Sequence, residues 1–88
     1  MEIVFKPKAQ QDREIIKKSG SQVTKNRLER ILTDILEHPY TGFANPEELK
    51  YDLTGKWSRE LSKKDRVVYR VDGEDLNVFS LLGHYADK

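Results

Sequence analysis

The stretch that decides the fold runs from Gln22 to Glu37 and reads QVTKNRLERILTDILE. Its apolar side chains recur at spacings of three and four residues, at Leu28, Ile31, Leu32, Ile35 and Leu36. This period matches one face of an α-helix, so the sequence predicts an amphipathic helix whose apolar side needs a surface to cover it. The pair His38-Pro39 ends the helix, because proline disfavours helical geometry at the residue before it.

Toward the N-terminus, the sequence predicts one strand and a shorter helix. Residues 1–6 alternate between two faces, with Ile3 and Phe5 on one of them, and Pro7 ends the strand. A first helix is expected over about residues 9–18, where apolar residues return to one side of a helix. The serine and glycine residues that follow supply a stop.

Toward the C-terminus, helical periodicity gives way to alternation, which is typical of strands. We expect strands over about residues 49–53, 57–62, 66–71 and 76–82. Asp72-Gly73 is a strong hairpin signal, since both residues tolerate positive φ. The predicted order is therefore β-α-α-β-β-β-β. This is an α+β fold with two N-terminal helices packed on one face of a mainly antiparallel sheet, whose last four strands form a meander.

Length and composition limit the class of protein. A chain of 88 residues is expected to form one domain over residues 1–88, with a shallow groove instead of a deep pocket. It has no cysteine, which excludes disulfides and thiolate ligands. No apolar run approaches the roughly 20 residues of a membrane span, and no signal-peptide pattern is seen. We therefore expect a cytoplasmic protein without membrane contact.

Charge is uneven along the chain although its sum is small. The 16 basic and 15 acidic residues give a net charge of +1. Between residues 50 and 71, seven basic residues stand against three acidic ones, whereas residues 72–88 hold four acidic residues and one basic. A basic stretch alone is most often a solvated face, so this pattern does not by itself predict nucleic-acid binding.

Six polar residues remain as candidates for chemistry. The two histidines lack a metal-binding spacing and the glycines form no phosphate-cradling loop, so we expect neither a metal nor another cofactor. Each candidate alone has a plainer explanation as a solvated residue. Together they offer a carboxylate base, cations, an imidazole acid and an aromatic ring for stacking, which are the parts that metal-free RNA cleavage needs. The six are Glu47, Lys50, Arg59, Arg66, His84 and Tyr85.

Three segments of the chain resemble a known family. They are residues 45–59 (NPEELKYDLTGKWSR), 65–71 (DRVVYRV) and 83–85 (GHY). In this order they resemble the YoeB and Txe branch of the RelE-type toxins, and the similarity extends from the N-terminal strand to Tyr85. The resemblance implies a RelE-like toxin fold and a ribosome-dependent messenger RNA endonuclease, or mRNA interferase. It also implies a partner antitoxin of the YefM or Phd type, with toxin homodimers or toxin-antitoxin hetero-oligomers as possible assemblies.

The resemblance also implies roles for four of the candidates. Glu47 corresponds to the general base of the family and His84 to its general acid. Arg66 corresponds to the residue that stabilises charge on the scissile phosphate. Tyr85 corresponds to a terminal aromatic residue beside them.

Two further candidates, Lys50 and Arg59, fall on or near family positions that contact RNA phosphates. We expect acidic residues of an antitoxin segment to oppose them and Arg66 in the same groove. The chain departs from the family pattern at two places. Glu60 stands where a relative has a second arginine, and residues 86–88 extend beyond the usual terminal tyrosine.

These residue types suit cleavage by the ribose 2′-hydroxyl. The hydroxyl needs a base to accept its proton, and the leaving 5′-oxygen needs an acid on the opposite side of the phosphate. A glutamate and a histidine can fill these roles near neutral pH, and an arginine can bind two non-bridging oxygens at once. The expected products carry a 2′,3′-cyclic phosphate and a 5′-hydroxyl.

Two other readings of the sequence stay open. The same fold could serve as a non-catalytic module that binds the ribosome or an antitoxin, in which case nothing requires Glu47, Arg66 and His84 to occur together. The chain could also be an ordinary small α+β protein whose basic strands are merely solvated. Its expression would then leave growth unharmed.

Overall fold

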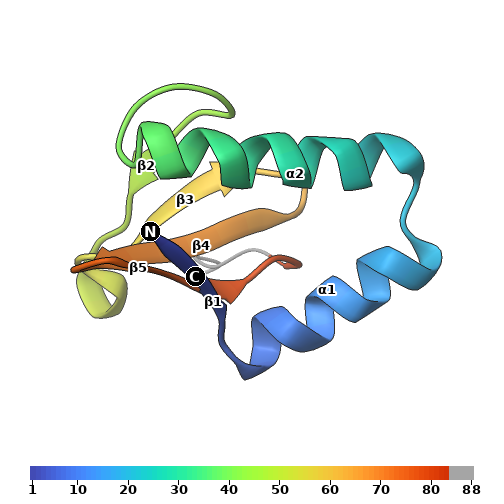
Figure 1. The fold of residues 1–88 in the computed structure, drawn as a ribbon, viewed down its shortest axis with the longest axis horizontal. Coiled ribbons are helices and arrows are strands. Elements are labelled where there is room, and N and C mark those ends of the chain that lie inside the picture. The colour runs from blue at the N-terminus through green and yellow to red at the C-terminus, as the bar shows by residue number, and fades with distance from the viewer. Residues whose placement is uncertain (84–88) are drawn as a thin grey trace.

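The protein is described here by a computed structural model, which places residues 1–83. Its helices are α1 (Pro7–Ser19) and α2 (Gln22–Glu37), and a short 3-10 helix η1 covers Tyr51–Leu53. The strands are β1 (Glu2–Phe5), β2 (Glu47–Glu48), β3 (Trp57–Glu60), β4 (Arg66–Asp72) and β5 (Asp75–Ser80). They form one sheet in the order β1-β5-β4-β3-β2, with both helices over one face (Figure 1).

The sheet confirms the predicted fold class. Strands β2 to β5 form an antiparallel meander, and β1 adds to the far edge of β5 as a parallel strand, with Ile3 opposite Leu76. A parallel neighbour needs a crossover connection, and the two helices between β1 and β2 supply part of it. This connection is why both helices lie on the same face.

The two layers meet in an apolar core between the helices and the sheet. Its helical side is the periodic stripe of α2 together with two residues of α1, and its sheet side comes from alternate positions of β4 and β5. The fully buried members include Ala9, Ile31, Ile35, Val67, Tyr69, Leu76 and Val78. The apolar face predicted for the helix at residues 22–37 is therefore the face that packs against the sheet.

The prediction of a strand over residues 49–53 is wrong. Only Glu47 and Glu48 pair with β3, and the backbone N–H of Leu49 makes one more bond, to the carbonyl of Lys56 at 2.9 Å. Beyond it Tyr51 adopts the left-handed φ of 60°, and the backbone N–H and hydroxyl of Thr54 both donate to its carbonyl. These local bonds replace ladder bonds, so the chain turns away from the sheet.

Helix α1 begins earlier than the sequence pattern predicts, at Pro7 instead of about Ala9. Proline is favoured in the first turn of a helix, because its missing N–H has no partner there and its φ is already helical. Among residues 1–83, no helix is both long enough and apolar enough to cross a lipid bilayer.

Candidate functional site

Glu47 and Arg66 share the face of the sheet that the helices leave open. Glu47 pairs with Ser58 and Ser58 with Val68, and residues directly opposite each other on neighbouring strands point to the same face. Val67 and Tyr69 pack into the helix-side core, so Arg66 and Val68 point the other way. The register thus brings one carboxylate and one guanidinium to a common surface.

The register also fixes how far apart these two residues lie on the open face. Arg66 lies two strands across from Glu47 and two residues along, which corresponds to roughly 12 Å between their Cα atoms. Both side chains are long enough to reach toward a group held between them. Leu49 and Val68 are buried without belonging to the helix-side core, and therefore form an apolar base on this open face.

The guanidinium of Arg66 is anchored on one side. Its Nη1 donates to the carbonyl of Ser62 at 2.9 Å and to that of Asp65 at 3.2 Å. Within residues 1–83, its Nε and Nη2 donors have no hydrogen-bond partner. Arg66 can therefore offer two donors to an anion while the other nitrogen fixes the plane of the group.

The chain leading to the C-terminal histidine is tied to the same place. The backbone N–H of Arg66 donates to the carbonyl of Gly83 at 3.2 Å, and the N–H of Gly83 donates to Oδ1 of Asp65 at 2.8 Å. His84 and Tyr85, which the sequence analysis assigned to the site, lie outside the described residues.

Asp12, a carboxylate of α1 that was not among the six candidates, holds the segment following β5. Its Oδ2 accepts from the backbone N–H groups of Leu81 and Leu82 at 2.9 and 3.0 Å, and from Nζ of Lys8 at 2.7 Å. Burial raises the pKa of Asp12, but these three donors outweigh burial and the pKa is lowered overall. A lone acid on the apolar side of a predicted helix is the signal that could have identified it.

Known proteins match both this sequence and this fold. Residues 5–85 match the family described as the YoeB-like toxin of bacterial type II toxin-antitoxin systems. The chain belongs to this toxin family. Its relatives include Toxin YoeB of Streptomyces coelicolor, which is 39% identical over 67 residues, 76% of this chain and 79% of the relative. Toxin RelK of Mycobacterium tuberculosis is 30% identical over 67 residues, which again cover 76% of this chain and 79% of the relative.

Solved structures agree with this assignment. A YoeB/ParE toxin from Agrobacterium tumefaciens superposes with a TM-score of 0.91 at 29% identity, covering 97% of this chain and all of that one. The YoeB-YefM complex from Staphylococcus aureus gives a TM-score of 0.87 at 29% identity, covering 97% and 98%. The resemblance to YoeB-type toxins of the RelE superfamily is thereby confirmed, and the protein is a toxin component of a type II system.

In this YoeB-like toxin, the expected contact between Arg59 and RNA is contradicted. The Arg59 side chain is fully buried, and all five of its N–H donors are used inside the fold. They reach Oδ2 of Asp34, the hydroxyl of Tyr69 and three loop carbonyls, those of His38, Thr41 and Phe43. An acidic antitoxin residue cannot oppose Arg59 for the same reason.

The physical reason for this error is the alternation of β3. Arg59 occupies the same face as Trp57 and Leu61, which is the face covered by the helices. A charge buried there must be paired, and the guanidinium of Arg59 is the main cause of the lowered pKa of Asp34. The alternation of Trp57, Arg59 and Leu61 in the sequence could have predicted that Arg59 is buried. The family resemblance, which implied a contact with RNA, was given more weight than this alternation.

Two further residues that the sequence analysis discussed, Lys50 and Glu60, lie near the ends of β2 and β3. Lys50 is exposed directly after β2, and its carbonyl accepts from the N–H of Leu53 at 3.1 Å. Glu60 pairs with Arg66 in the register, and its backbone carbonyl accepts from Nε and Nη2 of Arg27 at 3.0 and 2.8 Å. Glu60 therefore presents a carboxylate beside Arg66.

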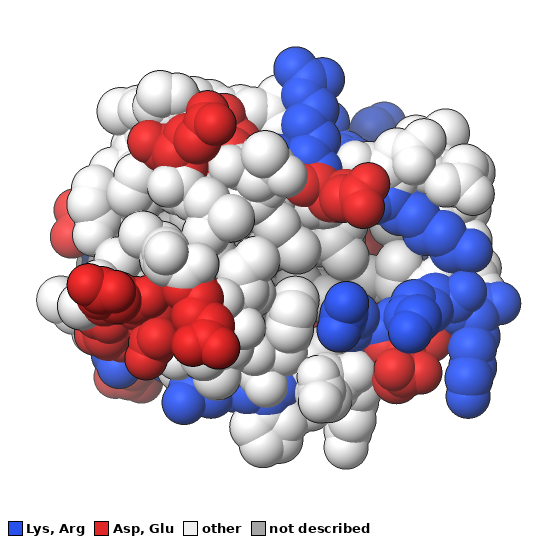
Figure 2. All heavy atoms as spheres, viewed as in Figure 1, with Lys and Arg blue, Asp and Glu red and all other residues white. Residues whose placement is uncertain are grey.

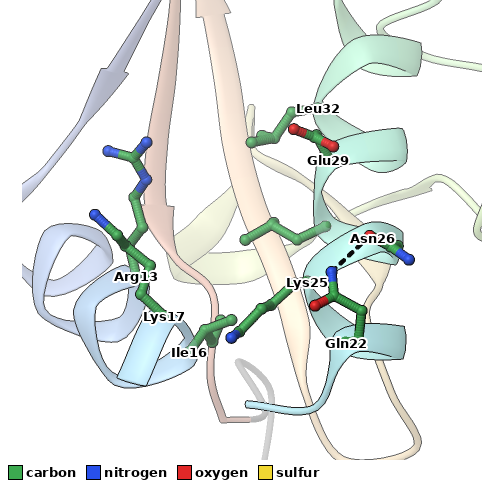
Figure 3. A pocket seen from close by; sticks show the side chains of 9 residues that line it. Arg13, Ile16, Lys17, Gln22, Lys25, Asn26, Glu29 and Leu32 are labelled. Atoms are coloured by element: carbon green, nitrogen blue, oxygen red, sulfur yellow. Dashed lines mark hydrogen bonds between the residues drawn. The ribbon is translucent and has the colours of Figure 1, made fainter. Parts of the chain in front are cut away.

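A separate hollow of about 300 Å³ lies between the two helices, away from the open face of the sheet. Arg13, Lys17 and Lys25 surround it (Figure 3), and basic side chains also gather over the α1–α2 connection on the right of Figure 2. Its only carboxylate is Glu29, and no histidine lines it. Across residues 1–83, no three acidic or histidine side chains come together as a metal-binding group.

Proposed function

We propose that this YoeB-like toxin is an endoribonuclease that cleaves messenger RNA on the ribosome by 2′-hydroxyl attack, without a metal ion, and so inhibits translation in the cytoplasm. The observation that carries the proposal is the placement of Glu47 and Arg66 on one open face of the sheet. The position of Gly83 also supports the proposal. Gly83 directly precedes His84 in the chain, and its carbonyl accepts a hydrogen bond from the backbone N–H of Arg66.

The roles follow from the chemistry of each group. Glu47 accepts the proton of the 2′-hydroxyl, whose oxygen then attacks the phosphorus, and His84 donates a proton to the leaving 5′-oxygen. The bond from phosphorus to the 5′-oxygen breaks as the bond to the 2′-oxygen forms. Arg66 stabilises the charge on the non-bridging oxygens with the two donors that its anchoring leaves available. The products are a 2′,3′-cyclic phosphate and a 5′-hydroxyl.

Two more residues are proposed to hold the RNA. Lys50, exposed three residues after Glu47, attracts a neighbouring phosphate, and Tyr85 stacks on a base next to the scissile bond. The net charge of only +1 fits an enzyme whose substrate is positioned by the ribosomal decoding site. Binding to free RNA is accordingly expected to be weak.

We also propose that a YefM- or Phd-type antitoxin binds this chain and blocks the open face. Two solved neighbours are complexes of YoeB with YefM from Staphylococcus aureus, one of them heterotetrameric. A third is a YoeB dimer from the same organism. An acidic antitoxin segment would oppose Lys50 and Arg66, and either a toxin homodimer or a toxin-antitoxin hetero-oligomer fits these neighbours.

Cleavage mapping on ribosomes tests the proposed reaction. Purified toxin is added to ribosomes carrying a defined message, and new 5′ ends are mapped by primer extension. We expect Glu47→Gln and His84→Gln each to slow cleavage by about 10² to 10⁴ without unfolding the protein. Full activity in either variant contradicts the assigned acid and base.

Glu48→Gln is the matched control. Glu48 is also exposed, but it pairs with Trp57 and so belongs to the opposite face of the sheet. We expect its cleavage rate to remain within a few-fold of that of the unchanged toxin. If the unchanged toxin stops translation but produces no new 5′ end, the chain is a non-catalytic ribosome-binding module instead.

A further inference from the structure

We propose that Lys56, held over the ring of Phe79, binds the RNA phosphate next to the scissile one and so forms a substrate subsite of its own. This inference rests on the proposed function and extends the site along the sheet. Neither the family resemblance nor the six candidate residues pointed to Lys56 or Phe79.

Lys56 lies diagonally next to Glu47 on the open face. Glu47 pairs with Ser58 of β3. Lys56 directly precedes β3, two residues before Ser58, and alternate residues of an extended chain point to the same face, so Lys56 and Glu47 share a face. Diagonal neighbours of this kind have Cα atoms about 7 to 8 Å apart. Their side chains therefore serve adjacent positions along one bound strand of RNA.

The ring of Phe79 fixes the position of the Lys56 ammonium. Nζ of Lys56 lies 4.1 Å from the ring centroid, and Cζ of Arg70 lies 5.5 Å from the same centroid. A cation over an aromatic face is attracted by the ring electrons, so the flexible lysine chain is ordered before any ligand arrives. Phe79 is half-buried and acts as a rigid support for the cation.

The two cations beside Phe79 are not equivalent. Arg70 donates from Nε to both carboxylate oxygens of Asp72, at 3.1 and 2.9 Å, which offsets its charge. No carboxylate in residues 1–83 forms an ion pair with Lys56. Lys56 is thus the ammonium that remains available to a phosphate, and Arg70 completes the support around the ring.

The charges along the strands define a path for RNA. Along β4 from its first residue toward the β4–β5 turn, Arg66 is the first residue of the path. The pair Glu47 and Ser58 lies opposite the next position on the same face, and Lys56 lies beside Arg70 at the position after that. Beyond that row the β4–β5 turn is acidic, and Figure 2 shows acidic side chains gathered over the left end of the molecule. The acidic residues brought together there are Glu2, Asp72, Glu74 and Asp75.

The acidic end explains why the subsite takes one phosphate and not a longer tract. A phosphate at Lys56 gains an unpaired cation, whereas the next phosphate would face carboxylates. Lys56 lies within residues 45–59, one of the segments that carry the family resemblance, next to Trp57 of β3.

Salt-dependent RNA binding tests the subsite without relying on cleavage. The probe is a short fluorescein-labelled single-stranded RNA with 2′-O-methyl riboses, which cannot undergo 2′-hydroxyl attack. Its Kd is measured by fluorescence anisotropy over a series of sodium chloride concentrations at low ionic strength. We expect Lys56→Gln to weaken binding several-fold and to reduce the slope of log Kd against log salt by about 0.7, the value for one phosphate contact on a single strand.

Three matched variants separate the subsite from general charge and from folding. Lys18→Gln removes an exposed cation at the end of α1, in the helical layer, and should leave the slope unchanged. Phe79→Tyr keeps a ring under Lys56 and should bind as the unchanged toxin does. Phe79→Leu keeps an apolar side chain but removes the ring, and should show part of the loss seen with Lys56→Gln.

Each result decides for or against the subsite. An unchanged Kd and slope for Lys56→Gln overturns it, as does an equal loss in Lys18→Gln. If Lys56→Gln weakens only the binding of an acidic antitoxin, the surface belongs to a protein partner and the RNA assignment is wrong. A lack of cleavage by the unchanged toxin contradicts the proposed function, whereas the anisotropy result still reports on Lys56.

Discussion

Nη1 of Arg59 donates to Oδ2 of Asp34 at 2.8 Å, and this pair joins β3 to α2 through the core. The same guanidinium binds carbonyls of the loop after α2, which leads directly to Glu47. A residue expected to touch RNA therefore acts as an internal clamp. It supports the proposed base indirectly, by holding the loop that precedes β2.

Arg59→Lys is expected to destabilise the fold by about 3 kcal/mol, although the positive charge is kept. Lysine has three donors on a flexible stem, so most of the loop carbonyls and the carboxylate of Asp34 lose their partner. Urea unfolding followed by circular dichroism measures the change. Lys50→Gln, at an exposed position, serves as the control with little expected loss, and unchanged stability in Arg59→Lys would contradict the clamp.

Gly42→Ala is expected to cost about 3 kcal/mol. Gly42 has a φ of 107°, and an added Cβ would lie 2.4 Å from Oδ2 of Asp34, which cannot move without leaving Arg59. Gly55→Ala is the matched control, since its φ is 94° and nothing lies near its Cβ position. Thermal or urea unfolding should show a clearly larger loss at Gly42. Equal losses would mean that backbone conformation alone matters.

Stability is expected to fall in acid through Asp12 and Asp34. The pKa of each is lower in the folded state than the ordinary 3.8, so the folded protein binds fewer protons than the unfolded chain. Their contribution is complete above the ordinary pKa and is lost as the pH falls through the lowered values. Urea midpoints at about pH 6, 4 and 3 measure this loss. The decline should be shallower in Asp12→Asn, and a flat profile in the unchanged toxin would refute the assignment.

Tyr51→Asn is expected to stabilise the protein by up to about 1 kcal/mol. Tyr51 has a left-handed φ of 60° and its side chain is 90% exposed, so little packing is lost. Asparagine adopts this backbone conformation more easily than tyrosine does. Tyr51→Phe should leave the urea midpoint unchanged, and a marked loss in Tyr51→Asn would show that the ring contributes to the fold.

Arg66→Ala is expected to slow cleavage on ribosomes by about 10² to 10³, with Arg66→Lys falling between it and the unchanged toxin. Lysine keeps the charge but not the planar pair of donors that suits two phosphate oxygens. Single-turnover cleavage at saturating toxin measures the chemical step. Equal rates for Arg66→Lys and the unchanged toxin would mean that charge alone is required at this position.

Much of the fold could be predicted because its signals are local. The apolar stripe of residues 22–37 specifies a helix, and alternation specifies most of the strands, since each pattern is read over a few neighbouring residues. The exception is the segment 49–53, whose alternation is the same as that of a strand. There the left-handed Tyr51 and the bonds from Thr54 turn the chain away, and polarity alone does not encode that turn.

The family motifs, present in the sequence by itself, determined the toxin family. The common face of Glu47 and Arg66 depends on the register between β2, β3 and β4, which the tertiary structure decided. Only the tertiary structure decided the use of Asp12, Arg59 and Lys56. Asp12 accepts from the backbone N–H groups of Leu81 and Leu82. Arg59 binds the carboxylate of Asp34 and three loop carbonyls, and Lys56 lies over the ring of Phe79, so every one of these partners is distant in sequence. Pairing across such distances depends on how the layers pack, because the residue type of an acid or a cation does not specify which group will meet it.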